Sequence, residues 1–177
     1  MSKKVSKSFL EEISIKSLGV IESTNIEFKP GLTVLTGETG AGKTMVLTAL
    51  GLVLGGKSDA ELVRTGQERA VITGRFSIPN SLQSQILENG GEIEDDSVVI
   101  TRTINSQGKS RVLIGNTVSS ASAITAFAAS LVEIHAQSSS SKLLKPAVSR
   151  ELLDRFGGID IAAYQVAYHQ YGELSRK

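Results

Sequence analysis

The chain carries the stretch Gly37-Glu38-Thr39-Gly40-Ala41-Gly42-Lys43-Thr44, a full match to the phosphate-binding loop pattern G-x-x-x-x-G-K-[ST]. The glycines let the backbone turn sharply and bring its N–H groups close to an anion. Lys43 is placed to reach the β- and γ-phosphates of a nucleotide, and the Thr44 hydroxyl to ligate Mg²⁺. The alternative is an accidental match in a glycine-rich turn, so the residues on either side of the loop matter.

The flanking residues have the pattern that a phosphate loop requires. Leu-Thr-Val-Leu-Thr at 32–36 predicts a buried strand that enters the loop, and residues 45–54 predict a helix that leaves it. Gly55 and Gly56 then end the helix. This order places the free N–H groups and the positive dipole end of the helix against the phosphates. The sequence therefore predicts nucleotide binding.

Composition is that of one ordinary globular domain. The chain has 177 residues, of which 40% are hydrophobic, and a formal net charge of +1, which neither requires nor excludes nucleic acid. It has no cysteine, no apolar run long enough to span a membrane and no secretory signal. We expect a soluble cytoplasmic protein that does not contact a membrane. Because aromatic residues make up only 5%, any DNA contact should be to the phosphate backbone rather than by base stacking.

The rest of the chain predicts strands and helices around the loop. Strands are expected at 9–16, 20–28, 69–78, 97–104, 110–114 and 131–134, and helices at 81–89 and 119–129. Residues 59–66 read as a short helical or irregular stretch, and residues 105–109 as a hairpin turn. The first two strands suggest a small antiparallel β-layer over one side of the nucleotide site.

The last segment has a different pattern. Residues 149–156 predict a helix that is interrupted at Gly157 and Gly158, and a second helix follows. In it Ile161, Tyr164, Tyr168 and Tyr171 recur at spacings of three and four, which is heptad spacing over two heptads. On spacing alone, a coiled coil and a helix packed on its own domain are equally good interpretations. Apart from Gly172, no glycine or proline stands between Gly158 and Lys177, so we expect the helix to continue beyond the chain.

The residues that complete a phosphate-loop hydrolase are missing. Such a site needs a carboxylate at the end of a second buried strand, to hold Mg²⁺ and orient water. No apolar run of four residues is followed by Asp, and Glu133 lies inside its predicted strand rather than at its end. The acidic run at 92–96 follows two glycines and reads as a solvated turn rather than a metal site. The guanine-reading N-K-x-D motif is also absent. The sequence therefore predicts half of a catalytic site.

Longer motifs carry a specific resemblance. The run Ile13-Ser-Ile-Lys-Ser-Leu-Gly-Val-Ile-Glu22 followed by residues 26–44 resembles the opening of the RecN family, bacterial SMC-like ATPases of DNA double-strand break repair. Residues 108–116, Gly-Lys-Ser-Arg-Val-Leu-Ile-Gly-Asn, are similar to the family's hairpin. Residues 131–137, Leu-Val-Glu-Ile-His-Ala-Gln, resemble the strand that leads into its Q-loop. The likeness covers nearly the whole chain.

The resemblance implies a fold and a division of the chain. It implies an α/β fold, the N-terminal lobe of an ABC/SMC-type P-loop ATPase head with an antiparallel β subdomain and the start of a coiled-coil helix. Residues 1–158 would form the lobe, with the P-loop and Q-loop, and residues 159–177 the root of the ascending coil. The signature motif, the Walker B carboxylates and the switch histidine would belong to a C-terminal lobe.

The resemblance also assigns roles to single residues. Gln137 corresponds to the Q-loop glutamine, which joins Thr44 in the Mg²⁺ shell and senses the γ-phosphate; an ordinary loop glutamine is the alternative. Arg64 lies where related heads place an arginine near nucleotide or DNA, although a solvated arginine is as good an interpretation. Lys109 and Arg111 could contact DNA phosphates. His135 fits packing at a strand end better than chemistry. The chain departs from the family pattern at Ala136 and at Ser138–Ser141, which puts the flexibility of the Q-loop in doubt.

The resemblance implies an ATPase whose two heads enclose ATP and Mg²⁺. Its partners would be the C-terminal lobe of the same protein, a second head in an ATP-dependent homodimer, and DNA at duplexes or double-strand break ends near the nucleoid. Two alternatives stay open: a self-contained small P-loop kinase or NTPase, which would need its own acidic Mg²⁺ ligand, and a nucleotide-binding interaction module without activity of its own.

Overall fold

The computed structural model describes residues 8–38, 42–132, 134, 149–150, 153, 156–157 and 162–174. The chain divides into two compact units, Met1–Glu133 and Ile134–Lys177, and each is described by itself. The phosphate-loop stretch lies in the first unit and the heptad-spaced helix in the second.

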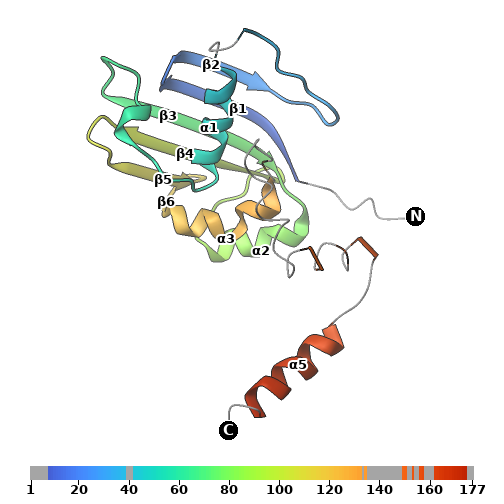
Figure 1. The fold of residues 1–177 in the computed structure, drawn as a ribbon. Helices are drawn as coiled ribbons and strands as arrows, with labels where there is room; N and C mark the ends of the chain where they lie inside the picture. Colours follow the sequence, from blue (N-terminus) through green and yellow to red (C-terminus); the bar gives the residue numbers. More distant parts are fainter. Residues whose placement is uncertain are drawn as a thin grey trace. The chain divides into compact units, whose positions relative to one another are not determined.

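The first unit is built on a six-stranded antiparallel sheet (Figure 1). In spatial order its strands are β2 (Ile21–Glu27), β1 (Phe9–Leu18), β3 (Arg69–Ser77), β4 (Ser97–Asn105), β5 (Ser110–Ile114) and β6 (Thr117–Ser119). The five strands predicted in these regions are confirmed, including the hairpin between β4 and β5. The short edge strand β6 was not predicted.

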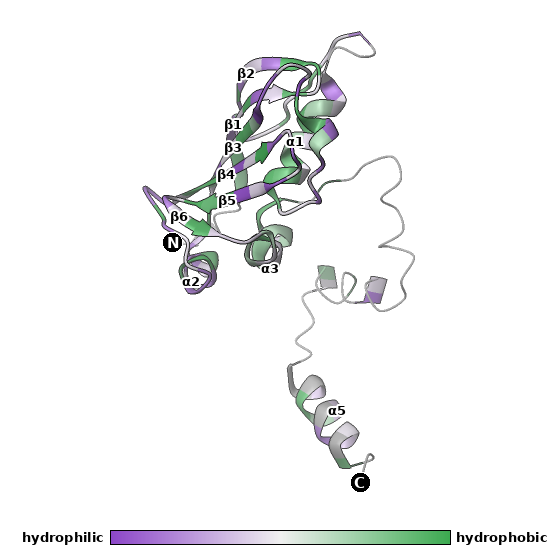
Figure 2. Ribbon diagram, turned by 90° about the vertical axis from the view of Figure 1, so that its left-hand side faces the viewer, coloured by the Kyte–Doolittle hydropathy of each residue, from purple (hydrophilic) through white to green (hydrophobic). Residues whose placement is uncertain are grey.

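One face of the sheet forms the core. Along β3 and β4 every second side chain is buried, as expected for a sheet with one covered face. Three α-helices accompany the sheet: α1 (Lys43–Val53), α2 (Asn80–Glu88) and α3 (Ala121–Leu131). Helix α1 contacts β1, β3 and β4, and α2 contacts α3. In Figure 2, α1 and α3 lie on the same side of the sheet, so the opposite face of the sheet is not covered by them.

Two of the predicted strands are wrong. Residues 32–36 form no strand, and Leu32, Val34 and Leu35 are 92%, 68% and 42% exposed. At the second site, Leu131 is the last residue of α3, and Val132 and Ile134 belong to no strand. A strand needs a neighbouring strand to satisfy its N–H and C=O groups, and no strand of the described residues pairs with either segment.

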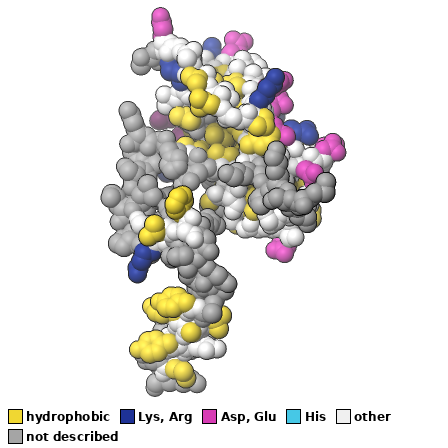
Figure 3. All heavy atoms as spheres, turned by 90° about the vertical axis from the view of Figure 1, so that its right-hand side faces the viewer, with side chains coloured by type: hydrophobic (Ala, Val, Ile, Leu, Met, Phe, Trp, Pro, Cys, Tyr) yellow, Lys and Arg dark blue, Asp and Glu magenta, His cyan; other side chains and the backbone are white. Residues whose placement is uncertain are grey.

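The second unit contains α5 (Ala162–Leu174), which confirms the predicted C-terminal helix. Its described side chains are mostly exposed and include Tyr164, Tyr168 and Tyr171. Figure 3 shows hydrophobic side chains along this helix. The rings of Tyr164 and Tyr168 stack with centroids 5.9 Å apart. Among the described residues, no helix has the length and apolar character needed to cross a membrane.

Candidate nucleotide-binding site

The site is built on the first turn of α1. Gly42 precedes the helix with φ 92° and ψ −3°, a conformation that favours glycine, and a Cβ there would lie 3.4 Å from Ile21 Cγ1. No side chain caps the helix, and no acidic residue stands in its first turn. The Val46 N–H bonds the Gly42 carbonyl at 3.1 Å, which leaves the N–H groups before it for an outside acceptor. This arrangement suits an anion.

Lys43 lies over the entry to the loop. Its Nζ donates a hydrogen bond to the carbonyl of Glu38 at 2.6 Å and another to the carbonyl of Gly37. These are neutral acceptors on the loop's own backbone. A phosphate oxygen is a charged and therefore stronger acceptor for the same ammonium. The chain thus places the lysine where a bound triphosphate could take over its hydrogen bonds.

Thr44 is exposed at the same helix end, as a ligand for a nucleotide-bound cation must be. The Thr48 hydroxyl donates a hydrogen bond to the Thr44 carbonyl at 3.0 Å. This contact does not involve the Thr44 hydroxyl. Thr39, Gly40, Ala41 and Gln137 lie outside the described residues. Within the described ranges, no three acidic, histidine or cysteine side chains gather to form a metal site. Of the described residues, Thr44 is the one that the phosphate-loop pattern places to hold a nucleotide-bound Mg²⁺.

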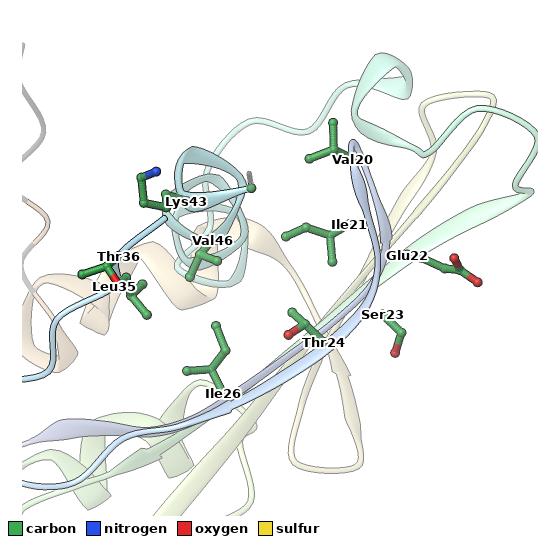
Figure 4. A pocket seen from close by; sticks show the side chains of 11 residues that line it. Val20, Ile21, Glu22, Ser23, Thr24, Ile26, Leu35, Thr36, Lys43 and Val46 are labelled. Carbon is green, nitrogen blue, oxygen red and sulfur yellow. The ribbon is translucent and has the colours of Figure 1, made fainter. Parts of the chain in front are cut away.

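A cavity of about 500 Å³ adjoins the loop (Figure 4). It lies between β2, residues 35–36 and the start of α1, and Lys43 and Gly42 are part of its wall. Figure 4 shows the aliphatic side chains of Ile21, Ile26 and Val46 directed toward the same space, while Glu22 points away from it. The cavity offers apolar surface immediately beside the phosphate site, which suits the base or ribose of a nucleotide.

Arg64 fastens the turn that supports this site. Its Nη1 donates to the carbonyl of Val20 at 2.7 Å and approaches that of Gly19 at 3.5 Å, and its backbone N–H bonds the carbonyl of Ser17 at 2.9 Å. The Gly19 and Val20 carbonyls belong to the turn between β1 and β2. This β1–β2 turn packs so closely on α1 that a Cβ at Gly19 would lie 2.6 Å from Met45 Sδ. Arg64 therefore acts on the loop's surroundings through the β1–β2 turn, a role that sequence reasoning missed.

Arg102 is a second feature that sequence reasoning missed. It stands on the inner face of β4, only 4% exposed, and its Nη2 donates to Ser58 Oγ at 3.3 Å. Its Nε and Nη1 have no hydrogen-bond partner. Burial lowers the pKa of this guanidinium. The alternation Val98, Ile100, Arg102, Ile104 would have revealed a charged residue at a core position.

The other predicted residues lie away from the loop. Lys109 ends the β4–β5 turn and Arg111 stands on β5, both exposed. The acidic run at 92–96 is a turn, as predicted, in which the Glu92 carboxylate accepts hydrogen bonds from the Asn116 N–H and the Thr117 hydroxyl. His135, Ala136 and residues 138–141 lie outside the described part of the chain.

Solved structures share this fold. The Smc head domain of Pyrococcus yayanosii, with a coiled coil and joint, matches with a TM-score of 0.69 at 22% identity, over 96% of this chain and 36% of that one. A protein from a study of ATP-driven dimerization and DNA-stimulated activation of SMC ATPases gives 0.60 at 22%, over 82% and 98%. The recombination mediator RecF with ATP gives 0.54 at 16%, over 67% and 29%. The fold is that of an SMC-type P-loop ATPase head, which confirms the predicted fold class.

Sequence comparison gives the family. The AAA domain family matches residues 12–158, and the chain belongs to it. Curated relatives are the DNA repair proteins RecN of Streptomyces coelicolor (40% identical, over 92% of this chain and 30% of the relative), Mycobacterium tuberculosis H37Rv (41%, 93% and 29%) and Bacillus subtilis (33%, 95% and 30%). The resemblance to RecN is thereby confirmed. The chain spans about 30% of the length of the curated relatives it matches.

Proposed function

We propose that this chain is the ATP-binding N-terminal half of an SMC-like ATPase head that acts in the repair of DNA double-strand breaks. The phosphate loop, Lys43 and Thr44 would hold ATP and Mg²⁺, with Gln137 completing the metal shell. Catalysis would require carboxylates from a C-terminal lobe of the same protein. Residues 1–158 would form the lobe, and residues 159–177 the root of a coiled coil that joins the two lobes.

The observation that carries this proposal is the exposed apolar segment at 32–36. It leads directly into the phosphate loop, and Leu32 and Val34 face solvent in a segment whose composition is that of a buried strand. Its apolar side chains, together with backbone groups that pair with no strand of the described residues, suit the edge of a sheet supplied by another part of the protein. In a self-contained kinase, we would expect the apolar side chains of this segment to be buried within the same chain.

ATP would then act at an interface between two heads. ATP-driven dimerization is described for an SMC ATPase whose fold this chain shares. The γ-phosphate is a compact charge that can bias a two-state interface, since it adds contacts only while it is present. Binding would engage two heads and hydrolysis would release them, which couples nucleotide state to the holding of DNA. Arg64, Lys109 and Arg111 would lie near the nucleotide or the DNA backbone.

Assembly with the missing lobe tests the proposal. The chain is mixed with the separately produced C-terminal remainder of the same protein and analysed by size-exclusion chromatography with light scattering. We expect a one-to-one complex that Leu32→Ser/Val34→Ser weakens. The matched control is Leu87→Ser/Val118→Ser, which removes two exposed apolar side chains elsewhere and should leave the complex intact. Absence of a complex, or equal loss in both variants, would contradict the proposal.

A further inference from the structure

Arg102 is a buried cation that uses little of its capacity for hydrogen bonding. It is 4% exposed and stands on the inner face of β4, where the register places Ile72 of β3 and Val112 of β5 on either side of it. Its Nη2 donates to Ser58 Oγ at 3.3 Å, whereas Nε and Nη1 have no hydrogen-bond partner among the described residues. A buried donor without an acceptor is destabilising. The position therefore favours an acceptor that the unmodified side chains around it do not supply.

The contact with Ser58 lies at the nitrogen that both forks of the guanidinium share. Nη2 forms one pair of parallel donors with Nε, along the side of the group, and another with Nη1, at its end. Each unused nitrogen is therefore the second member of a fork that Ser58 Oγ already half occupies. A phosphate on this oxygen would bring further charged acceptors to the same place, and two parallel N–H···O bonds to one phosphate are the strong form of such a pair.

Ser58 lies on a segment that an enzyme can reach. Its neighbours Lys57 and Asp59 are exposed, and Ser58 itself is half-buried. The segment begins at Gly56, which approaches α1 so closely that a Cβ there would lie 2.7 Å from the Gly51 carbonyl oxygen. The backbone is thus held against α1 immediately before the serine, while the residues on either side of it face solvent.

The burial of the guanidinium favours an attached phosphate over a free anion. Its unused nitrogens are buried, so an anion from solution would have to enter beneath the segment that covers them. The cavity beside the phosphate loop is lined by neither Arg102 nor Ser58. A phosphate carried by Ser58 Oγ starts within hydrogen-bond distance of the guanidinium. Of the adjacent charges, Lys57 favours the phosphate and Asp59 opposes it; both are exposed and largely screened, which leaves Arg102 as the dominant partner.

We propose that Ser58 is a phosphorylation site and that Arg102 receives its phosphate. A protein kinase transfers the γ-phosphoryl group of a nucleoside triphosphate: a bond forms between Ser58 Oγ and the γ-phosphorus, and the bond from that phosphorus to the β–γ bridging oxygen breaks. The nucleoside diphosphate leaves, and the hydroxyl proton passes to the base of the kinase. The phosphate then pairs with the guanidinium. This inference goes beyond the proposed function and does not depend on it.

The modified residue lies between two supports of the phosphate loop. Helix α1, whose first turn carries the anion site, ends shortly before Ser58, and the 3₁₀ helix η1 (Ala60–Leu62) and Arg64 follow it. Arg64 holds the β1–β2 turn, which packs on Met45 of α1. Phosphorylation of Ser58 would therefore fix the segment that joins these two supports.

Thermal unfolding of matched full chains tests the pairing. Phosphoserine is incorporated during synthesis at position 58, in the unmodified background and in Arg102→Met. The matched control carries phosphoserine at position 106 in the same two backgrounds, because Ser106 is exposed in the β4–β5 turn. The chain without phosphoserine is also measured with and without inorganic phosphate, which separates an attached phosphate from a free one.

We expect the phosphate on Ser58 to raise the midpoint of thermal unfolding by about 3 °C or more where Arg102 is present, and to give no rise in Arg102→Met. The phosphate on Ser106 should shift the midpoint equally in both backgrounds. An equal shift from the Ser58 phosphate with and without Arg102, or a fall where Arg102 is present, would overturn the inference. An Arg102-dependent rise from inorganic phosphate alone would overturn it too, since that result identifies a site for a free anion.

Use of the site in cells is measured on the full-length protein purified from its own cells. Trypsin cleaves after Lys57 and Arg64 and releases a peptide in which Ser58 carries the only hydroxyl side chain, so a phosphate on this peptide identifies the residue. We expect this phosphopeptide by mass spectrometry, and its loss in Ser58→Ala. Its absence from both growing and DNA-damaged cells would overturn the assignment of Ser58 as a modification site.

Discussion

Lys43 Nζ donates a hydrogen bond to the carbonyl oxygen of Glu38 at 2.6 Å, across the mouth of the phosphate loop. The ammonium is therefore held beside the anion site by neutral backbone acceptors. A triphosphate would replace them by charged oxygens, which form hydrogen bonds about twice as strong. The first turn of α1, which no side chain caps, supplies further donors at the same place.

Removing this ammonium should weaken nucleotide binding. We expect Lys43→Ala to cost about 1.5–3 kcal/mol, the usual worth of a hydrogen bond to a charged group, which is roughly a ten- to hundredfold rise in Kd. The matched control is Lys57→Ala, an exposed lysine beyond the other end of α1. Titration of a fluorescent ATP analogue measures both. An unchanged Kd for Lys43→Ala would remove the lysine from the site.

The Thr44 hydroxyl should make binding depend on Mg²⁺. Chelation of Mg²⁺ should weaken ATP binding by the unmodified chain, and Thr44→Val should lose most of that dependence because it lacks the ligand oxygen. Thr48→Val removes the same atom one turn later, where the hydroxyl is bonded to the Thr44 carbonyl, and should retain the dependence. The same titrations with and without EDTA measure it. Equal Mg²⁺ dependence in all three proteins would contradict the assignment.

Arg64 should support both stability and the site. Arg64→Ala removes a charged donor from the Val20 carbonyl, so we expect the free energy of unfolding to fall by about 1–3 kcal/mol. The freed β1–β2 turn should also raise the Kd for ATP, since that turn packs on Met45 in the first turn of α1. Arg69→Ala, an exposed arginine on β3, should change stability by less than about 0.5 kcal/mol. Urea unfolding measures both variants, and equal free energies of unfolding for Arg64→Ala and the unmodified chain would contradict this role of Arg64.

Arg102 should be dispensable for folding in spite of its burial. Two of its nitrogens lack partners, and an unpaired buried polar group is destabilising, so Arg102→Met should leave the free energy of unfolding unchanged or raise it. By contrast, Ile100→Ala on the same face of β4 should lower it by about 2–5 kcal/mol through the cavity it creates. Thermal and urea unfolding measure both. A large loss with Arg102→Met would show that the guanidinium has a stabilising partner.

Elements whose packing and pairing partners lie within this chain could be predicted from their sequence patterns. The antiparallel strands were predictable because alternation along β3 and β4 reflects partners that lie in this chain. The helix after the phosphate loop was predictable because Gly42 and Gly55 mark its ends with positive φ.

The errors have a common physical reason. Residues 32–36 and 131–134 have apolar patterns that predict burial, yet no strand of the described residues pairs with them. A strand forms only where a neighbouring strand satisfies its N–H and C=O groups, and the apolar pattern of a segment does not show whether such a neighbour exists. The role of Arg64 could not be predicted for a different reason. Its hydrogen-bond partners are backbone carbonyls, which every residue has, so no residue type in the sequence indicates them.

The central claim is that this chain holds half of an active site, and ATP hydrolysis tests it most directly. Phosphate release is measured for the chain alone, for the C-terminal lobe alone and for their mixture, each with the unmodified chain and with Lys43→Ala. We predict turnover only in the mixture, and its loss with Lys43→Ala. Robust hydrolysis by the chain alone, abolished by Lys43→Ala, would contradict the claim and identify a self-contained P-loop enzyme.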